Sequence, residues 1–113
     1  MKKLLLVTNE YYHLVDIDDI IYCKSDNAYT EFYLRQQEKI RVSDSLKHFE
    51  NKLQDYQFVR IHQSYLVNTS CITKIQKQEG LSVILENGRI LPVSSRKKKS
   101  LMHLLKKNKQ IQS

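Results

Sequence analysis

Apolar residues in this chain come in short runs, and polar turn-forming residues interrupt them every few positions. The longest unbroken apolar run, Leu4–Val7, has four residues, far below the roughly 20 that a membrane-spanning helix needs. Val, Ile, Leu and Tyr dominate the runs, and several runs alternate apolar with polar positions, which is typical of half-buried strands. The pattern therefore predicts a chain that is mainly β, built from short strands.

The expected strands are Lys3–Thr8, Tyr12–Asp16, Ile20–Cys23, Tyr29–Leu34, Lys39–Val42, Phe58–His62, Tyr65–Asn68, Ile72–Gln78, Leu81–Leu85 and Arg89–Val93. The connections are short and rich in turn residues, so we expect hairpins and antiparallel sheets rather than βαβ units. Asn87-Gly88 is the strongest turn signal, because this pair suits a turn in which both central residues have positive φ.

Two helices are expected. Ser43, Asp44 and Ser45 offer N-caps ahead of apolar residues spaced along one helical face, which predicts a short helix over residues 46–53. Ser94 or Ser95 would cap a terminal helix with three leucines on one side, and residues 108–113 should fray. At 113 residues and 41% hydrophobic, with no repeat or Pro-rich linker, the chain is predicted to be one domain over residues 1–113.

The cysteines and the N-terminus favour a cytoplasmic protein. Cys23 and Cys71 lie far apart in apolar surroundings, so we expect buried, reduced thiols rather than a disulfide or a metal site. Met1-Lys2-Lys3 precedes an apolar run that is too short for a signal peptide, and no small-residue cleavage site follows.

The sequence argues against catalysis and against a metal or cofactor. None of the four histidines is spaced with another His, Cys or carboxylate as a metal site requires. His62 and Ser64 lie two residues apart, as a base and a nucleophile could, but no glycine elbow surrounds Ser64. The chain has only two glycines, both in expected hairpin turns, which leaves no phosphate-cradling loop. We therefore expect no enzyme.

Positive charge is concentrated in the last quarter of the chain. Residues 1–86 carry 11 Lys or Arg and 12 Asp or Glu, whereas residues 87–113 carry 8 Lys or Arg and no acid. Such a one-sided patch suits a polyanion, although a solvated tail would also explain it. Arg96–Lys99 fall in the first turn of the expected terminal helix, where cations oppose the helix dipole. A bound phosphate at that helix start would relieve the conflict.

Several motifs together carry a resemblance to a known family. They are Asp19–Tyr22 ahead of the expected polar loop Lys24–Asn27, then Asn27–Thr30, Ser45–Lys47, Phe58–Asn68 followed by Ile72, and Leu91–Ser94 running into a basic helix. In this order and spacing, the chain resembles the LytTR-type DNA-binding domain, the effector module of many bacterial two-component response regulators. The stretch Phe58–Asn68 is the most specific part of the match.

The resemblance implies an elongated fold of about ten short strands in small antiparallel sheets, with one short internal helix and a C-terminal helix. It also implies sequence-specific binding of double-stranded DNA for transcriptional regulation, with loops set into successive major grooves. By position, the implied DNA-binding residues are Asp26, Asn27 and Ala28 before Tyr29, the corner of Gln63 with His62 and Ser64, and Ser95, Arg96, Lys97 and Lys98 at the last helix.

The chemistry of these positions leaves alternatives open. The Gln63 amide can bridge adenine N6 and N7, or it is simply a polar residue at a strand end. Asn27 could read adenine likewise or shape a turn, and Arg96 could bind guanine or a phosphate. His62 could contact DNA, or it could be a structural histidine bonded across the corner. Ala28 and Ser95 replace the more polar residues often found there in the family, so the target sequence stays open.

The resemblance further implies paired binding on direct repeats, with a homodimer on DNA. The family usually carries an N-terminal receiver domain, which we expect to be missing from this chain. The chain is then either a fragment with residues 1–2 added at its start or a standalone regulator. The alternative function is a basic interaction module for an acidic protein or an anionic surface. A membrane is not expected, because the terminal helix has only enough apolar surface to dock on a sheet.

Overall fold

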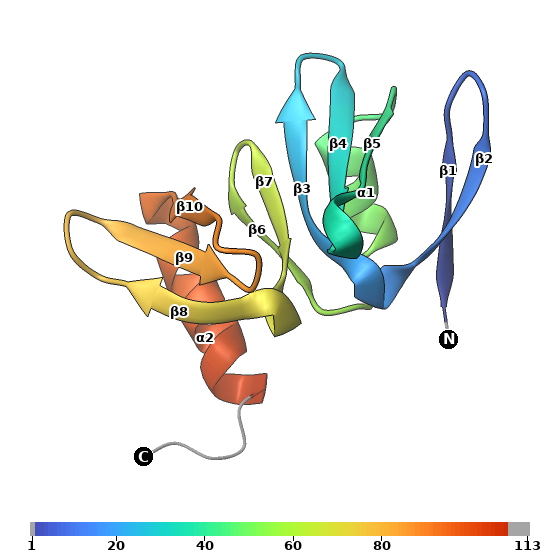
Figure 1. Cartoon of the computed structure of the whole chain (residues 1–113). Coiled ribbons are helices and arrows are strands. Elements are labelled where there is room, and N and C mark those ends of the chain that lie inside the picture. The colour runs from blue at the N-terminus through green and yellow to red at the C-terminus, as the bar shows by residue number, and fades with distance from the viewer. Residues whose placement is uncertain (1, 109–113) are drawn as a thin grey trace.

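Ten strands form three separate antiparallel sheets in the computed structural model, which describes residues 2–108 (Figure 1). A two-stranded sheet pairs β1 (Lys3–Val7) with β2 (Tyr12–Asp16). The central sheet has the order β5-β4-β3-β7-β6, from β3 (Ile20–Asp26), β4 (Tyr29–Leu34), β5 (Lys39–Val42), β6 (Phe58–His62) and β7 (Tyr65–Asn68). The third sheet has the order β10-β9-β8, from β8 (Ile72–Gln76), β9 (Leu81–Leu85) and β10 (Ile90–Val93).

The mainly β fold and its elongated shape are confirmed. The molecule measures 47 × 30 × 25 Å along its principal axes. The two-stranded hairpin lies at one end, and the third sheet with the terminal helix lies at the other (Figure 1). Every strand pairing is antiparallel, as the hairpin spacing predicted.

Both expected helices form. The first, α1 (Leu46–Lys52), begins where predicted, because the Ser45 hydroxyl accepts a hydrogen bond from the His48 main-chain N–H. The second, α2 (Lys98–Asn108), follows a 3-10 turn over Ser95–Lys97. Ser94 stands at the cap position of that turn, but its side chain makes no capping hydrogen bond. Of the expected fraying over 108–113, residues 109–113 lie outside the described residues, and Asn108 ends α2.

Two hydrophobic cores lie on opposite faces of the central sheet. One face, with Cys23 and Phe32, packs against α1 and the β1–β2 hairpin, and Phe32 meets Phe49 of α1 edge-to-face at 4.7 Å between ring centroids. The other face, with Tyr22 and Val67, packs against the third sheet and α2. The central sheet is therefore covered on both sides, and its functional residues must lie at its ends. Both cysteines are buried and free.

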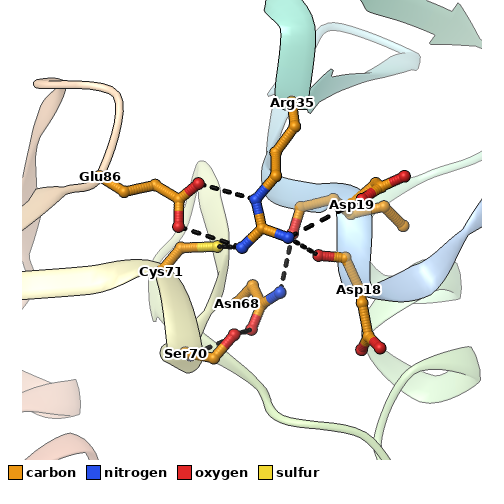
Figure 2. A network of polar contacts seen from close by, with 8 residues as sticks. Asp18, Asp19, Arg35, Asn68, Ser70, Cys71 and Glu86 are labelled. Carbon is orange, nitrogen blue, oxygen red and sulfur yellow. Dashed lines mark hydrogen bonds and ion pairs between the residues drawn. The ribbon is translucent and has the colours of Figure 1, made fainter.

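Arg35 links the central sheet to the third sheet (Figure 2). Its guanidinium makes two hydrogen bonds to the Glu86 carboxylate, at 2.7 and 3.1 Å, and a third to the Asp18 carbonyl oxygen at 2.8 Å. Beside it, the Asn68 side chain donates to the Ile20 carbonyl oxygen at 2.9 Å. Planar, bidentate pairs of this kind are among the stronger surface ion pairs, so the network fixes how the two sheets sit relative to each other.

Some local expectations are wrong, and the strand expected over residues 72–78 ends at Gln76. The polar loop predicted over residues 24–27 is shorter, because β3 continues through Asp26 and leaves only Asn27 and Ala28 in the turn. The turn at Asn87-Gly88 has positive φ only at Gly88 (88°). The Gly88 N–H donates to the Leu85 carbonyl oxygen at 2.8 Å, and the Asn87 side-chain oxygen accepts a hydrogen bond from the Arg89 N–H at 3.1 Å, so the turn forms without a second left-handed residue.

Candidate nucleic-acid interface

The three predicted DNA-binding segments lie at the same end of the central sheet. Lys24 of β3 pairs with Tyr65 of β7, and beyond that pair the Ser25 N–H donates to the Ser64 carbonyl oxygen at 2.9 Å. This bond places the β3–β4 turn beside the β6–β7 turn, and both point upward in Figure 1. The Ser94 N–H donates to the Ile61 carbonyl oxygen at 2.9 Å, which holds the start of the terminal helix against the end of β6.

The β3–β4 turn presents two exposed residues, Asn27 and Ala28. Asn27 has φ 55°, a left-handed conformation that asparagine tolerates better than most residues. Its side chain makes no hydrogen bond within residues 2–108, so the amide is free to meet a ligand. The residue therefore shapes the turn through its backbone and leaves its side chain available.

Asp26, at the base of the same turn, is partly buried and paired. Its carboxylate lies 3.3 Å from the Arg41 guanidinium, which in turn lies 4.2 Å from the centroid of the Tyr29 ring. A bare carboxylate would repel a phosphate backbone, and the Arg41 cation offsets that charge. The pairing indicates that Asp26 orients Arg41 and Tyr29 beside the turn.

The corner between β6 and β7 is closed by the His62 side chain. His62 Nδ1 accepts a hydrogen bond from the Ser64 main-chain N–H at 3.0 Å. An accepting Nδ1 carries no proton, so in the neutral ring Nε2 carries it. Gln63, between them, is exposed, and its side chain makes no hydrogen bond within the part of the chain that the structure describes. His62 thus has a structural contact, and Gln63 is the free side chain of the corner.

Arg60 braces this corner from β6. Its guanidinium donates to the His62 carbonyl oxygen at 2.9 Å, to the Gln63 carbonyl oxygen, and to the Glu50 carboxylate of α1 at 2.8 Å. The Arg60 side chain is 17% exposed and that of Glu50 is 28% exposed. All three guanidinium nitrogens are used, so the main chain on both sides of Gln63 is tied to a helix.

The third segment forms the start of the terminal helix. Ser95, Arg96 and Lys98 are exposed, whereas Lys97 is partly enclosed. Lys97 lines a groove of about 340 Å³ between α1 and β6, together with Glu50 and Arg60. Among residues 2–108, no carboxylate lies within 4.0 Å of the amino or guanidinium groups of this segment. Its charge is therefore left for a partner.

Other chemistry finds no support at this surface. Within residues 2–108, no three His, Cys, Asp or Glu side chains gather as metal ligands would. Neither α1 nor α2 has the length and apolar character that a membrane crossing requires. What the end of the central sheet does offer is free amides on two turns and a basic helix start.

The sequence of the chain matches a known family. The family model described as the LytTr DNA-binding domain matches residues 10–106. The chain belongs to the LytTR family of DNA-binding domains. The family is one of DNA-binding domains and not of enzymes, so the chain is a DNA-binding domain.

Relatives of the chain are response regulators. It is 35% identical over 105 residues to the sensory transduction protein LytT of Bacillus subtilis, covering 91% of this chain and 43% of that protein. It is 30% identical over 101 residues to an uncharacterized response regulatory protein of Vibrio cholerae, covering 86% and 37% respectively. This LytTR chain thus spans less than half the length of the curated relatives it matches.

A solved structure has the same fold. The LytTr DNA-binding domain of a methyl-accepting/DNA response regulator from Bacillus cereus matches with a TM-score of 0.79 at 24% identity, over 93% of this chain and 97% of that one. The arrangement of three small sheets and two helices is therefore that of a LytTR domain.

Sequence reasoning missed two site residues, Arg60 and Arg41. Arg60 lies within the motif Phe58–Asn68, but a bulge between Arg60 and His62 breaks the alternation of β6, so no local pattern predicts its contact with the corner. Arg41 lies opposite Glu31 in the β4–β5 register, and only the three-dimensional structure brings it over Tyr29. Both act on the shape of the turns rather than on their exposed surface.

Proposed function

We propose that this LytTR domain binds double-stranded DNA in a sequence-specific manner, through the turns and helix start at one end of its central sheet. The observation that carries this proposal is the convergence of three segments, more than thirty residues apart in sequence, at that end, held by the hydrogen bonds from Ser25 to Ser64 and from Ser94 to Ile61. No recognition helix is needed, because the turns themselves enter the major groove.

Base reading falls to the free amides. The exposed Gln63 side chain can donate to N7 and accept from N6 of adenine, and Asn27 offers the same chemistry on the neighbouring turn. The Arg96 guanidinium can hydrogen-bond a guanine or a phosphate. The Ala28 methyl group can contact the methyl group of a thymine, and the Ser95 hydroxyl can hydrogen-bond the DNA backbone. His62, Ser64 and Asp26 support these side chains from within the turns.

Phosphate binding falls to the basic helix start. Arg96, Lys97 and Lys98 follow Ser94 with no acid nearby in the chain, and the first amides of the helix add their own positive potential. Because phosphate contacts release counterions, this segment supplies most of the affinity and most of its salt dependence.

For the protein in its cell, we propose the effector role of a response regulator in two-component signalling. The relatives named above support this role, since they are response regulatory and sensory transduction proteins. Two copies on direct repeats, as a homodimer on DNA, would each set their turns into a major groove. A DNA partner of this kind places the protein in the cytoplasm.

A gel shift with heparin as competitor tests the proposal against generic anion binding. Specific binding predicts a complex with a target duplex that survives a heparin concentration at which complexes with random duplex dissociate. If both complexes disappear together, the basic surface binds anions without reading sequence, and an acidic protein becomes the better partner.

A further inference from the structure

We propose that the outer face of the β1–β2 hairpin is a contact surface for a second copy of this chain. The inference goes beyond DNA binding and does not depend on it. The surface consists of four side chains that are not part of either core: Leu5, Val7, Tyr12 and Leu14.

The strand register makes these four side chains one continuous apolar patch. Leu5 pairs with Leu14, and Val7 pairs with Tyr12. Cross-strand partners point to the same side of a sheet, so all four lie on one face. Leu4, Leu6 and Val15 point to the other face and are buried in the first core. The hairpin is therefore apolar on both faces, but within residues 2–108 only the face with Leu4, Leu6 and Val15 belongs to a hydrophobic core.

The exposed fractions show how unusual this face is. Leu5 is 50% exposed, Val7 52%, Leu14 68% and Tyr12 78%. Scattered exposed apolar residues need no explanation, but a contiguous patch on a small soluble chain commonly marks an interaction surface. A two-stranded hairpin is also marginal by itself, so covering its second face would stabilise it.

The area fits a weak dimer. From the usual sizes of Leu, Val and Tyr side chains, the face exposes on the order of 500 Å² per molecule. Two such faces packed together would bury roughly 1,000 Å², the lower limit for a specific interface. We therefore expect reversible, concentration-dependent pairing rather than an obligate dimer.

The charge distribution favours self-contact at this end. Residues 1–16 hold two lysines, one glutamate and one aspartate, so their charges cancel in a chain of net charge +7. Lys3 and Asp16, at one edge of the face, already pair with each other at 2.8 Å. The basic helix α2 lies at the opposite end of the molecule (Figure 1). Two copies joined by their hairpins therefore keep their positive ends far apart.

The pairing is an isologous one. Each copy contributes the same patch, so a two-fold axis relates the copies, and their sheets stack about 10 Å apart. Copies on direct repeats are instead related by a shift along the duplex. The hairpin contact is therefore separate from contacts between neighbours on repeats, and it can join copies that are bound to different segments of DNA.

Sedimentation equilibrium of the full chain tests the contact without DNA. The average mass of the wild type should rise from 13.5 kDa toward twice that value as concentration increases through the micromolar range. Leu14→Lys should remain monomeric, because pairing would bury two facing charges. Ile90→Lys is the matched control: Ile90 is also an exposed apolar strand residue, 57% accessible, but it lies on β10, and the variant should dimerise as the wild type does.

Tyr12→Thr provides a second variant that keeps strand preference and should weaken pairing several-fold. A wild type that stays at 13.5 kDa up to millimolar concentration would overturn the proposal, as would a Leu14→Lys variant that dimerises normally. Binding of Leu14→Lys to a duplex with one repeat should equal that of the wild type. Failure of the wild type itself to bind that duplex would count against the DNA-binding proposal alone.

Discussion

The guanidinium group of Arg60 donates a hydrogen bond to the main-chain carbonyl oxygen of Gln63. The same group bonds the His62 carbonyl oxygen and the Glu50 carboxylate. The side chain proposed to read a base therefore stands on a main chain that is tied to α1. Fixing a reading group before binding lowers the ordering cost of recognition.

Arg60→Gln should lower affinity for the best duplex about tenfold, equivalent to roughly 1.4 kcal/mol, with a much smaller change on random DNA. Arg60→Lys should restore little of the lost affinity, since a lysine cannot make the same forked set of hydrogen bonds. Fluorescence anisotropy on both duplexes measures the two affinities. Lys47→Gln is the control, because Lys47 lies 3.9 Å from Glu50 without bonding the corner. Equal losses on both duplexes would show that Arg60 supplies charge rather than position.

Gln63→Ala removes the free amide of the corner. We expect a loss of about 1–3 kcal/mol on the best duplex and little change on random DNA. Gln76→Ala, an exposed glutamine on β8 in the third sheet, should change neither affinity. The same anisotropy titrations provide the comparison, and a Gln63→Ala variant that keeps full specific affinity would remove Gln63 from the reading set.

Replacing Arg96, Lys97, Lys98 and Lys99 together by Gln should weaken binding to all duplexes. The slope of log affinity against log salt should become less negative by about 0.9 for each phosphate that the variant no longer neutralises. Thermal stability should not fall, because cations at a helix start oppose the dipole. The control is the double variant Lys106→Gln with Lys107→Gln, at the far end of α2. It removes two positive charges, half as many as the quadruple variant, from outside the proposed phosphate-binding segment. An unchanged affinity and slope in the quadruple variant would contradict the phosphate-binding role.

The Arg35–Glu86 pair predicts a pH dependence of stability. Hydrogen bonding from Arg35 holds the pKa of the Glu86 carboxyl below its usual range. A carboxyl whose pKa is depressed by folding stabilises the native state above its unfolded pKa, and this stabilisation is lost as pH falls through the folded value. Urea unfolding of the wild type at pH 7 and at acidic pH should show this loss, and Glu86→Gln should show a smaller one. Glu79→Gln, exposed in a turn, should behave as the wild type.

The sequence predicted the ten strands well because each is short, alternating and bounded by turn residues. The Ser45 cap was likewise predictable, since the capping bond spans only three residues. The end of β3 was not, because Lys24, Ser25 and Asp26 are polar, as loop residues usually are. They continue the strand because they pair with Glu31, Thr30 and Tyr29 of β4, and the polar pattern alone does not show where the hairpin turn begins.

The residues of the candidate site likewise include some that could be predicted from the sequence and some that could not. Gln63 and Asn27 could be selected from the family motif, and neither side chain makes a hydrogen bond among residues 2–108. Arg60 and Arg41 act through bonds to Gln63 and Asp26, which depend on how strands and helix pack. The exposed hairpin face was also missed, because alternation could not tell which side of β1 and β2 faces the core when both sides are apolar.

Selection of duplexes from a random pool, followed by sequencing, tests the central claim most directly. Wild-type protein should enrich a defined motif that occurs as two copies in direct orientation. The Gln63→Ala variant should enrich the same motif with one base position relaxed. A wild-type selection that yields no motif, at a salt concentration where the protein still binds duplex, would contradict sequence-specific recognition by this domain.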